Sequence, residues 1–111
     1  MRRLPNVQSL KEAVERVIES NIEDHYRPRD FILATQYGNA PNLFEVCYKL
    51  IHKAEAVEFI ERKIQDYPTL LTLEDFVCRY GPKWHFDAAT VEQANASRER
   101  FDQVAHQTRY A

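Results

Sequence analysis

The stretch LFEVCYKLIHKAEAVEFIERKIQDYP, residues 43–68, limits the folds open to this chain more than any other feature. Before Pro68 it contains neither glycine nor proline, and apolar residues recur at every third or fourth position. That spacing places the apolar side chains along one side of an α-helix. A helix of this length is unusual in a small domain. The segment therefore predicts either one long helix or two helices with a bend near Ala54, and we favour the bend.

Helix start signals occur before four apolar segments. In each, a residue that can cap a helix precedes the segment, and in most of them an acidic residue follows three positions later. The predicted starts are Ser9 with Glu12, Asn42 with Glu45, Thr72 with Asp75, and Asp87 or Thr90. A further helix is predicted over residues 30–37, ended by Gly38, and Gly81-Pro82 predicts the end of the helix that starts at Thr72.

These signals together predict an all-α fold, a compact bundle of five to six short-to-medium helices in a single domain of 111 residues. No apolar segment shows the alternation that a strand partner would need. Residues 1–8 are predicted as a flexible basic arm. Residues 83–111 are predicted as a C-terminal helical extension, which should dock weakly because its apolar stripe is thin.

Composition restricts the classes of function. The net charge of −2 argues against nucleic acid held by a broad basic field, since phosphate contacts need clustered Lys and Arg. Only two glycines are present, which disfavours glycine-rich phosphate loops. We see neither a signal peptide nor an apolar run long enough to span a membrane. The expected setting is the cytoplasm, in a bacterial or phage system.

Two sets of residues could in principle support chemistry. His52 and Glu55 lie one helical turn apart and could share a metal, but no second Glu/His pair repeats the spacing, so a surface ion pair is the favoured interpretation. Cys47 and Cys78 each fall on an apolar stripe, which indicates reduced, buried thiols rather than nucleophiles or a disulfide. We therefore expect no enzyme activity, no cofactor and no small-molecule substrate.

Charged and aromatic side chains suggest binding surfaces. Four glutamates on the first helix form an acidic ridge, which is either a solvated face or a site for a basic partner. Trp84 lies in a connecting segment, where it either anchors an interface or, as we favour, closes the open end of the bundle. The ridge consists of Glu12, Glu15, Glu19 and Glu23, and basic residues at helix ends are Arg62, Lys63, Arg79 and Lys83.

Residues 42–68 resemble part of the bacterial effector-associated domains, which are small death-like helical bundles. The similarity consists of an apolar helix that ends in a phrase of the form L-I-x-x-A-E-A, a short second helix and a proline turn. Lys53 and Tyr67 depart from the family pattern, which has an aromatic residue and an asparagine at these places. The positions that match are Leu50, Ile51, Ala54, Glu55, Ala56, Phe59, Ile60 and Pro68.

The resemblance implies a non-enzymatic adaptor that pairs with a like domain and so brings an effector to its trigger. The leading hypothesis is a protein-interaction module, and the residues expected to bind the partner are Glu55, Glu58, Arg62, Lys63 and Trp84. A second hypothesis is a small nucleic-acid-linked regulator, which Arg2-Arg3 and the segment 27–29 would serve. A third is an inhibitor of a nucleic-acid enzyme that uses the acidic ridge.

Overall fold

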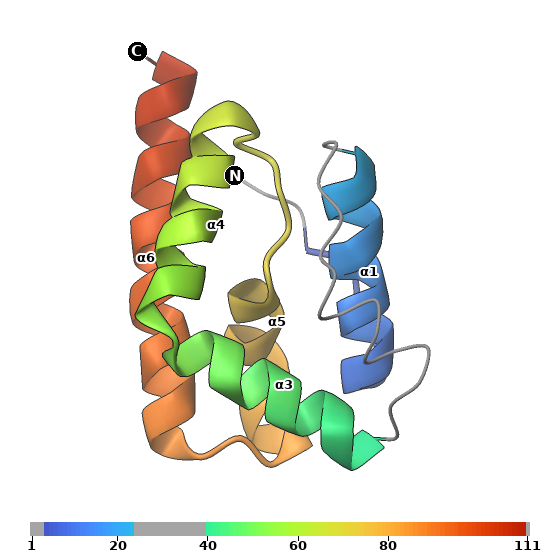
Figure 1. The fold of residues 1–111 in the computed structure, drawn as a ribbon. Coiled ribbons are helices and arrows are strands. Elements are labelled where there is room, and N and C mark those ends of the chain that lie inside the picture. Colours follow the sequence, from blue (N-terminus) through green and yellow to red (C-terminus); the bar gives the residue numbers. More distant parts are fainter. Residues whose placement is uncertain (1–3, 24–39, 111) are drawn as a thin grey trace.

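The computed structural model describes residues 4–23 and 40–110, and within these ranges every regular element is a helix (Figure 1). This confirms the all-α bundle. The helix predicted for 30–37 lies outside the described residues. The elements are α1 (Leu10–Glu23), α3 (Ala40–His52), α4 (Ala54–Asp66), α5 (Leu73–Tyr80), the 3-10 helix η1 (Gly81–Trp84) and α6 (Ala88–Tyr110).

Most helix starts agree with the capping signals. Ser9 Oγ accepts a hydrogen bond from the backbone N–H of Glu12 at 3.1 Å, and α1 begins at the next residue after Ser9. Thr72 caps α5 with a complete capping box. Asp87 rather than Thr90 caps α6, because Asp87 Oδ1 accepts from the Thr90 N–H at 3.0 Å. These side chains satisfy backbone donors that a helix start leaves without a partner.

The start of α3 was predicted wrongly. Asn42 does not cap this helix, because α3 already begins at Ala40. Pro41 is then the second helical residue, a place where proline is well tolerated since its missing N–H would have no acceptor there anyway. Pro41 is thus part of the first helical turn.

The favoured bend between α3 and α4 is confirmed. Lys53 is the one non-helical residue between them, with φ −92° and ψ 108°, and α4 begins at Ala54. α3 and α4 therefore run in different directions (Figure 1). His52, the last residue of α3, and Lys53, at the corner, are both exposed.

Side chains from the described residues form two hydrophobic clusters. The first lies among α1, α3, α5 and the start of α6, and the second lies between α4, α6 and the segment before α5. Members of the first are Val7, Ala13, Val14, Val17, Leu43, Cys47, Ile51, Leu73, Phe76, Val77, Phe86 and Ala94. Members of the second are Val57, Ile64, Leu70 and Phe101.

α6 joins the two clusters and is not a loosely docked extension. It lies beside α4 and packs also on α3, α5 and η1 (Figure 1). Its buried positions are Thr90, Ala94, Ser97 and Phe101, which recur every three or four residues and so share one face. Three of these side chains are small, so the sequence shows only a thin apolar stripe, although this face of the helix is buried from Thr90 to Phe101.

Glycine at position 81, the residue after α5, is required for space rather than for a left-handed backbone conformation. Its φ of −50° and ψ of −50° are ordinary right-handed values, and the chain continues from it into η1. A Cβ at this position would lie 2.8 Å from Val91 Cγ2 and 3.2 Å from Val77 Cγ1. The left-handed residue that ends η1 is His85, with φ 70°. Gly81 therefore permits the close approach of η1 to α5 and α6.

Residues 4–8 lie against the bundle rather than forming a free arm. Val7 is buried in the first cluster, and its backbone N–H donates to the hydroxyl oxygen of Tyr80 at 3.4 Å. Leu4 also packs against that cluster. Residues 1–3 lie outside the described part of the chain.

Candidate interaction surface

The outer face of α4 carries three of the predicted binding residues. Val57 and Ile64 are two turns apart and buried in the second cluster, which fixes the inner face of the helix toward α6. Glu55, Glu58 and Arg62 follow one another at spacings of three and four, so they share the opposite, solvent-facing side. All three are exposed. We call Glu55, Glu58 and Arg62 the α4 face.

Lys63 does not belong to this face. It follows Arg62 directly and is therefore turned by roughly 100° around the helix. Its side chain is half-buried, and its ammonium nitrogen lies 5.6 Å from the centre of the Phe59 ring. The cation is attracted by the negative face of that ring. The sequence predicted one binding surface that contains all four charged residues. In the structure three of them share a face, whereas Lys63 lies over an aromatic ring.

Trp84 also lies apart from the α4 face. It belongs to η1, which packs on α5 and α6. Its ring stacks on Tyr80 with 5.0 Å between the centroids, and the Arg79 guanidinium carbon lies 5.4 Å from the centre of the Tyr80 ring. Trp84 is half-buried and packs against the first cluster. Stacking on Tyr80 and packing against the first cluster thus bury part of the Trp84 side chain.

His52 and Glu55 do not form the ion pair that the spacing suggested. The break at Lys53 puts them on different helices, and both are exposed. His52 Nε2 instead lies 2.8 Å from the Thr90 hydroxyl oxygen on α6, a hydrogen-bond distance. Hydrogen bonds from Thr90, and to a smaller extent the nearby His52, hold the pKa of Asp87 below its usual value. The histidine thus fastens the end of α3 to the start of α6.

The two cysteines are unpaired thiols. Cys47 is fully buried, and this burial, with a smaller contribution from the Glu74 carboxylate, raises the pKa of its thiol to about 12. Burial also raises the pKa of Cys78, which is half-buried, to about 11, although nearby Arg98 acts in the opposite direction. Since the thiolate is the nucleophilic form, both side chains are protonated and act as packing groups at neutral pH.

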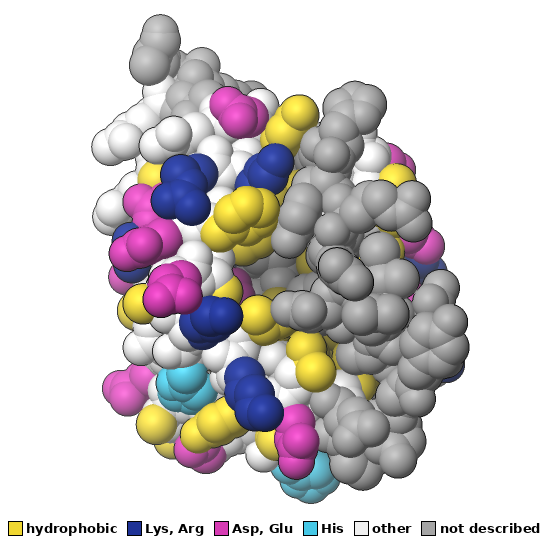
Figure 2. Space-filling model, viewed as in Figure 1, with side chains coloured by type: hydrophobic (Ala, Val, Ile, Leu, Met, Phe, Trp, Pro, Cys, Tyr) yellow, Lys and Arg dark blue, Asp and Glu magenta, His cyan; other side chains and the backbone are white. Residues whose placement is uncertain are grey.

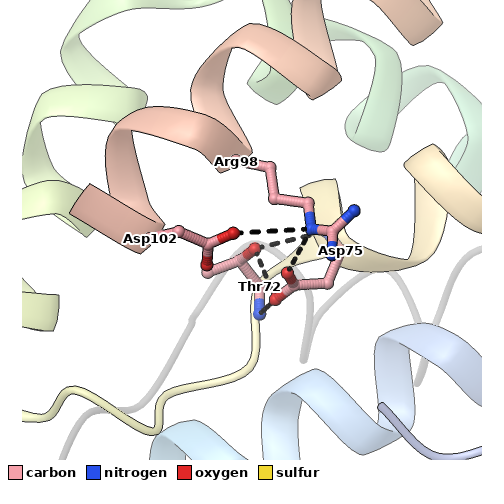
Figure 3. A network of polar contacts seen from close by, with 4 residues as sticks. All are labelled: Thr72, Asp75, Arg98 and Asp102. Atoms are coloured by element: carbon pink, nitrogen blue, oxygen red, sulfur yellow. Dashed lines mark hydrogen bonds and ion pairs between the residues drawn. The ribbon is translucent and has the colours of Figure 1, made fainter. Parts of the chain in front are cut away.

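Sequence analysis missed a polar network that holds α5 to α6 (Figure 3). One carboxylate oxygen of Asp75 accepts from the Thr72 N–H and the Thr72 hydroxyl, each at 3.0 Å. Arg98 Nε lies 3.5 Å from the other carboxylate oxygen and 3.9 Å from an Asp102 oxygen. Only the Thr72–Asp75 part was visible as a local motif. Arg98 is distant in sequence and looked like one of many surface charges.

The acidic ridge on α1 is partly occupied by intramolecular contacts. Glu12 accepts a hydrogen bond from the Gln8 N–H at 3.1 Å, and Glu19 pairs with Arg16 at 2.9 Å. Glu15 and Glu23 are exposed. The arrangement is that of a solvated helix face with one capping residue.

Other predicted binding residues lie outside the described part of the chain. These are Arg2 and Arg3 and the segment 27–29. Across the described ranges, no three His, Cys, Asp or Glu side chains gather in a way that would hold a metal ion. Among the helices that the structure describes, none combines the length and apolar composition needed to cross a bilayer.

Neither a protein-family model nor a curated protein nor a solved structure matches the chain at a significant level. The roles of its residues must therefore be argued from the geometry above.

Proposed function

We propose that this chain is a non-enzymatic protein-interaction module, acting as an adaptor or as a subunit of a helical oligomer, and that the α4 face contacts the partner. The observation that carries the proposal is that the side chains of Glu55, Glu58 and Arg62 are exposed on one side of a helix. Within the described ranges these three side chains make no hydrogen bond or ion pair. The resemblance of residues 42–68 to effector-associated domains implies the same class of function.

Rigid support makes this face suitable for recognition. The opposite side of α4 is buried through Val57 and Ile64, and Glu61 at the edge forms an ion pair with Arg100 on α6. A binding surface held in place loses little conformational freedom on association. Fixed charges of both signs steer the encounter and set the register of the two partners.

The visible side of the molecule fits this mode of binding. Charges of both signs and hydrophobic side chains are interspersed over α3 and α4 (Figure 2). Interfaces of non-obligate complexes have this mixed character, with a polar rim around a small apolar centre. A protein with a complementary charge pattern is therefore the expected partner.

The test is reversal of the charges on α4. The variant carries Glu55→Lys, Glu58→Lys, Arg62→Glu and Lys63→Glu, so the net charge of −2 is unchanged. A matched control reverses Lys11, Glu15, Lys83 and Glu92, which are exposed residues on other elements and also leave the net charge unchanged. Association is measured by affinity capture from the native cell and by light scattering at several concentrations.

The proposal predicts that reversal on α4 weakens association at least tenfold, which corresponds to about 1.4 kcal/mol. The control variant should bind like the unaltered chain, and both should show the same helical circular dichroism. Capture of the same partner protein that survives reversal of these four charges would refute the assignment of this face.

A further inference from the structure

The break between α3 and α4 is not encoded by the residues at the break. Lys53 adopts an extended backbone, yet its side chain makes no capping hydrogen bond, and neither glycine nor proline occurs between residues 43 and 67. Lys, Ala and Glu, which form the phrase KAEA from Lys53 onward, are all good helix formers. Residues that favour a continuous helix thus occupy a sharp corner.

The backbone leaves helical geometry at one residue only. The carbonyl oxygen of Lys53 accepts from the N–H of Val57 at 3.1 Å, as the carbonyl before any helix does, and the Lys53 N–H donates to the Leu50 carbonyl oxygen at 3.3 Å. The first N–H groups of α4 have no intrahelical acceptor, because a helix start always leaves them without one. Straightening the chain at Lys53 would give them carbonyl acceptors in the last turn of α3.

Packing at a distance holds the chain bent. Leu43, Cys47 and Ile51 on α3 are buried in the first cluster, whereas Val57 on α4 is buried in the second. Ile51 and Val57 are six residues apart, so on a straight helix they would point about 120° away from each other. With α4 seated on α6, a straightened α3 would therefore direct its apolar side away from its own bundle.

We propose that Lys53 is a hinge for exchange of the segment before it between two copies of this chain. In the exchanged form α3 and α4 merge into one helix from Ala40 to Asp66, about 40 Å long at 1.5 Å per residue. The α3 residues Leu43, Cys47 and Ile51 then pack on α5 and α6 of the second copy.

A second copy is the partner that fits. The first cluster is built from both sides of the hinge, since Val14 and Ile51 precede it and Phe76, Val77 and Ala94 follow it. Another copy offers the same residues in the same arrangement, so the contacts of α1 and α3 with α5 and α6 are recovered in trans. Exchange of identical elements in this way is a low-cost route to a dimer.

The discriminating variant is Ala54→Pro. Ala54 is exposed and is the first residue of α4, where proline suits a helix start. Proline there also favours an extended residue before it, which is the conformation Lys53 already has. A continuous helix, in contrast, cannot accommodate this proline. Ala88→Pro is the matched control, since Ala88 is the exposed first residue of α6 and is not at the hinge.

The three proteins are refolded at high concentration and their masses measured by light scattering after size exclusion. We expect the unaltered chain and Ala88→Pro to yield a species of twice 13.1 kDa that persists on dilution. Ala54→Pro should remain monomeric with the same circular dichroism and melting temperature. The inference fails if the unaltered chain gives no such dimer, or if Ala54→Pro dimerises equally well.

A second pair of variants tests the hinge if Ala54→Pro does not fold. Lys53→Ala should give a dimerisation constant about 25-fold larger than Lys53→Gly, because glycine disfavours a helix interior by about 1 kcal/mol relative to alanine and each dimer contains two merged helices. Equal amounts of dimer would overturn the inference. The charge-reversed α4 variant distinguishes this association from the proposed function, since the exchanged dimer should survive reversal whereas binding through the α4 face should not.

Discussion

Replacing Asp75 by alanine is the sharpest test of how this bundle is fastened. The Asp75 side chain is only 8% exposed, and its two oxygens face different parts of the molecule. One receives the N–H and hydroxyl of Thr72 at the start of α5, and the other faces Arg98 in the middle of α6. The substitution therefore removes the two hydrogen bonds that Thr72 donates to the Asp75 carboxylate and a contact between helices at once, while the Thr72 hydroxyl can still accept from the backbone N–H of residue 75.

The cost follows from the burial of each partner. The Thr72 N–H is buried, and a buried donor left without an acceptor costs about 1–3 kcal/mol. The lost hydrogen bond from the Thr72 hydroxyl adds about 0.5–1.5 kcal/mol. Arg98 is half-exposed at 48%, so water replaces its lost partner and its share is at most about 1 kcal/mol. We expect a total loss of about 2–4 kcal/mol, a large part of the roughly 5–15 kcal/mol that stabilises a domain.

Equilibrium unfolding in urea, followed by circular dichroism, measures this loss. Asp75→Asn keeps an oxygen acceptor for Thr72 and removes the charge, so it should cost only about 1 kcal/mol. A double-mutant cycle with Arg98→Met isolates the ion pair, whose coupling should not exceed about 1 kcal/mol. A loss below about 1 kcal/mol for Asp75→Ala would refute the argument, because it would mean that the hydrogen bonds from Thr72 to Asp75 and the contact with α6 contribute almost nothing.

Three other substitutions test separate features. Gly81→Ala should destabilise by about 1–3 kcal/mol in urea unfolding because its Cβ would meet Val91, and a Val91→Ala background should recover more than half of this. The pKa of Cys47 rises on folding from 9.0 to about 12, so its contribution to stability is complete below pH 9 and is lost as pH rises toward 12. Unfolding followed between these values should show a shallower pH slope for Cys47→Ala. Lys53→Asn supplies the missing cap of α4 and should raise the free energy of unfolding by about 0.5–1 kcal/mol, measured by thermal melting.

Helix starts could be read from the sequence because capping is a local interaction. Ser9 and Thr72 each bond to a backbone group three residues ahead, so the signal lies within one helical turn. Ala40 was missed because Pro41 is equally compatible with a loop and with a first helical turn.

The candidate surface was predictable in composition but not in orientation. Sequence analysis identified Glu55, Glu58 and Arg62 as exposed residues, and they are. It added Lys63 because charged neighbours look equivalent in sequence. Which of them faces a partner depends on the rotation of α4 about its axis, which is set by where Val57 and Ile64 are buried. In the observed orientation of α4, the Lys63 side chain lies over the Phe59 ring and not on the α4 face.

The position of α6 shows why an apolar stripe alone underestimates a helix contact. A search for large apolar side chains in α6 finds few and predicts weak docking. Ala94 and Ser97 are nevertheless fully buried, and small side chains let two helix backbones approach closely. Arg98 then reaches Asp75 across the resulting short gap. The contact between α5 and α6 consists of apolar packing through Val91 and Ala94 and one charged pair, and both depend on a partner helix that residues 88–110 do not specify. Substituting the fully buried Ser97 by leucine should accordingly overpack the inner face of α6 and lower the free energy of urea unfolding, although it would strengthen the apolar stripe.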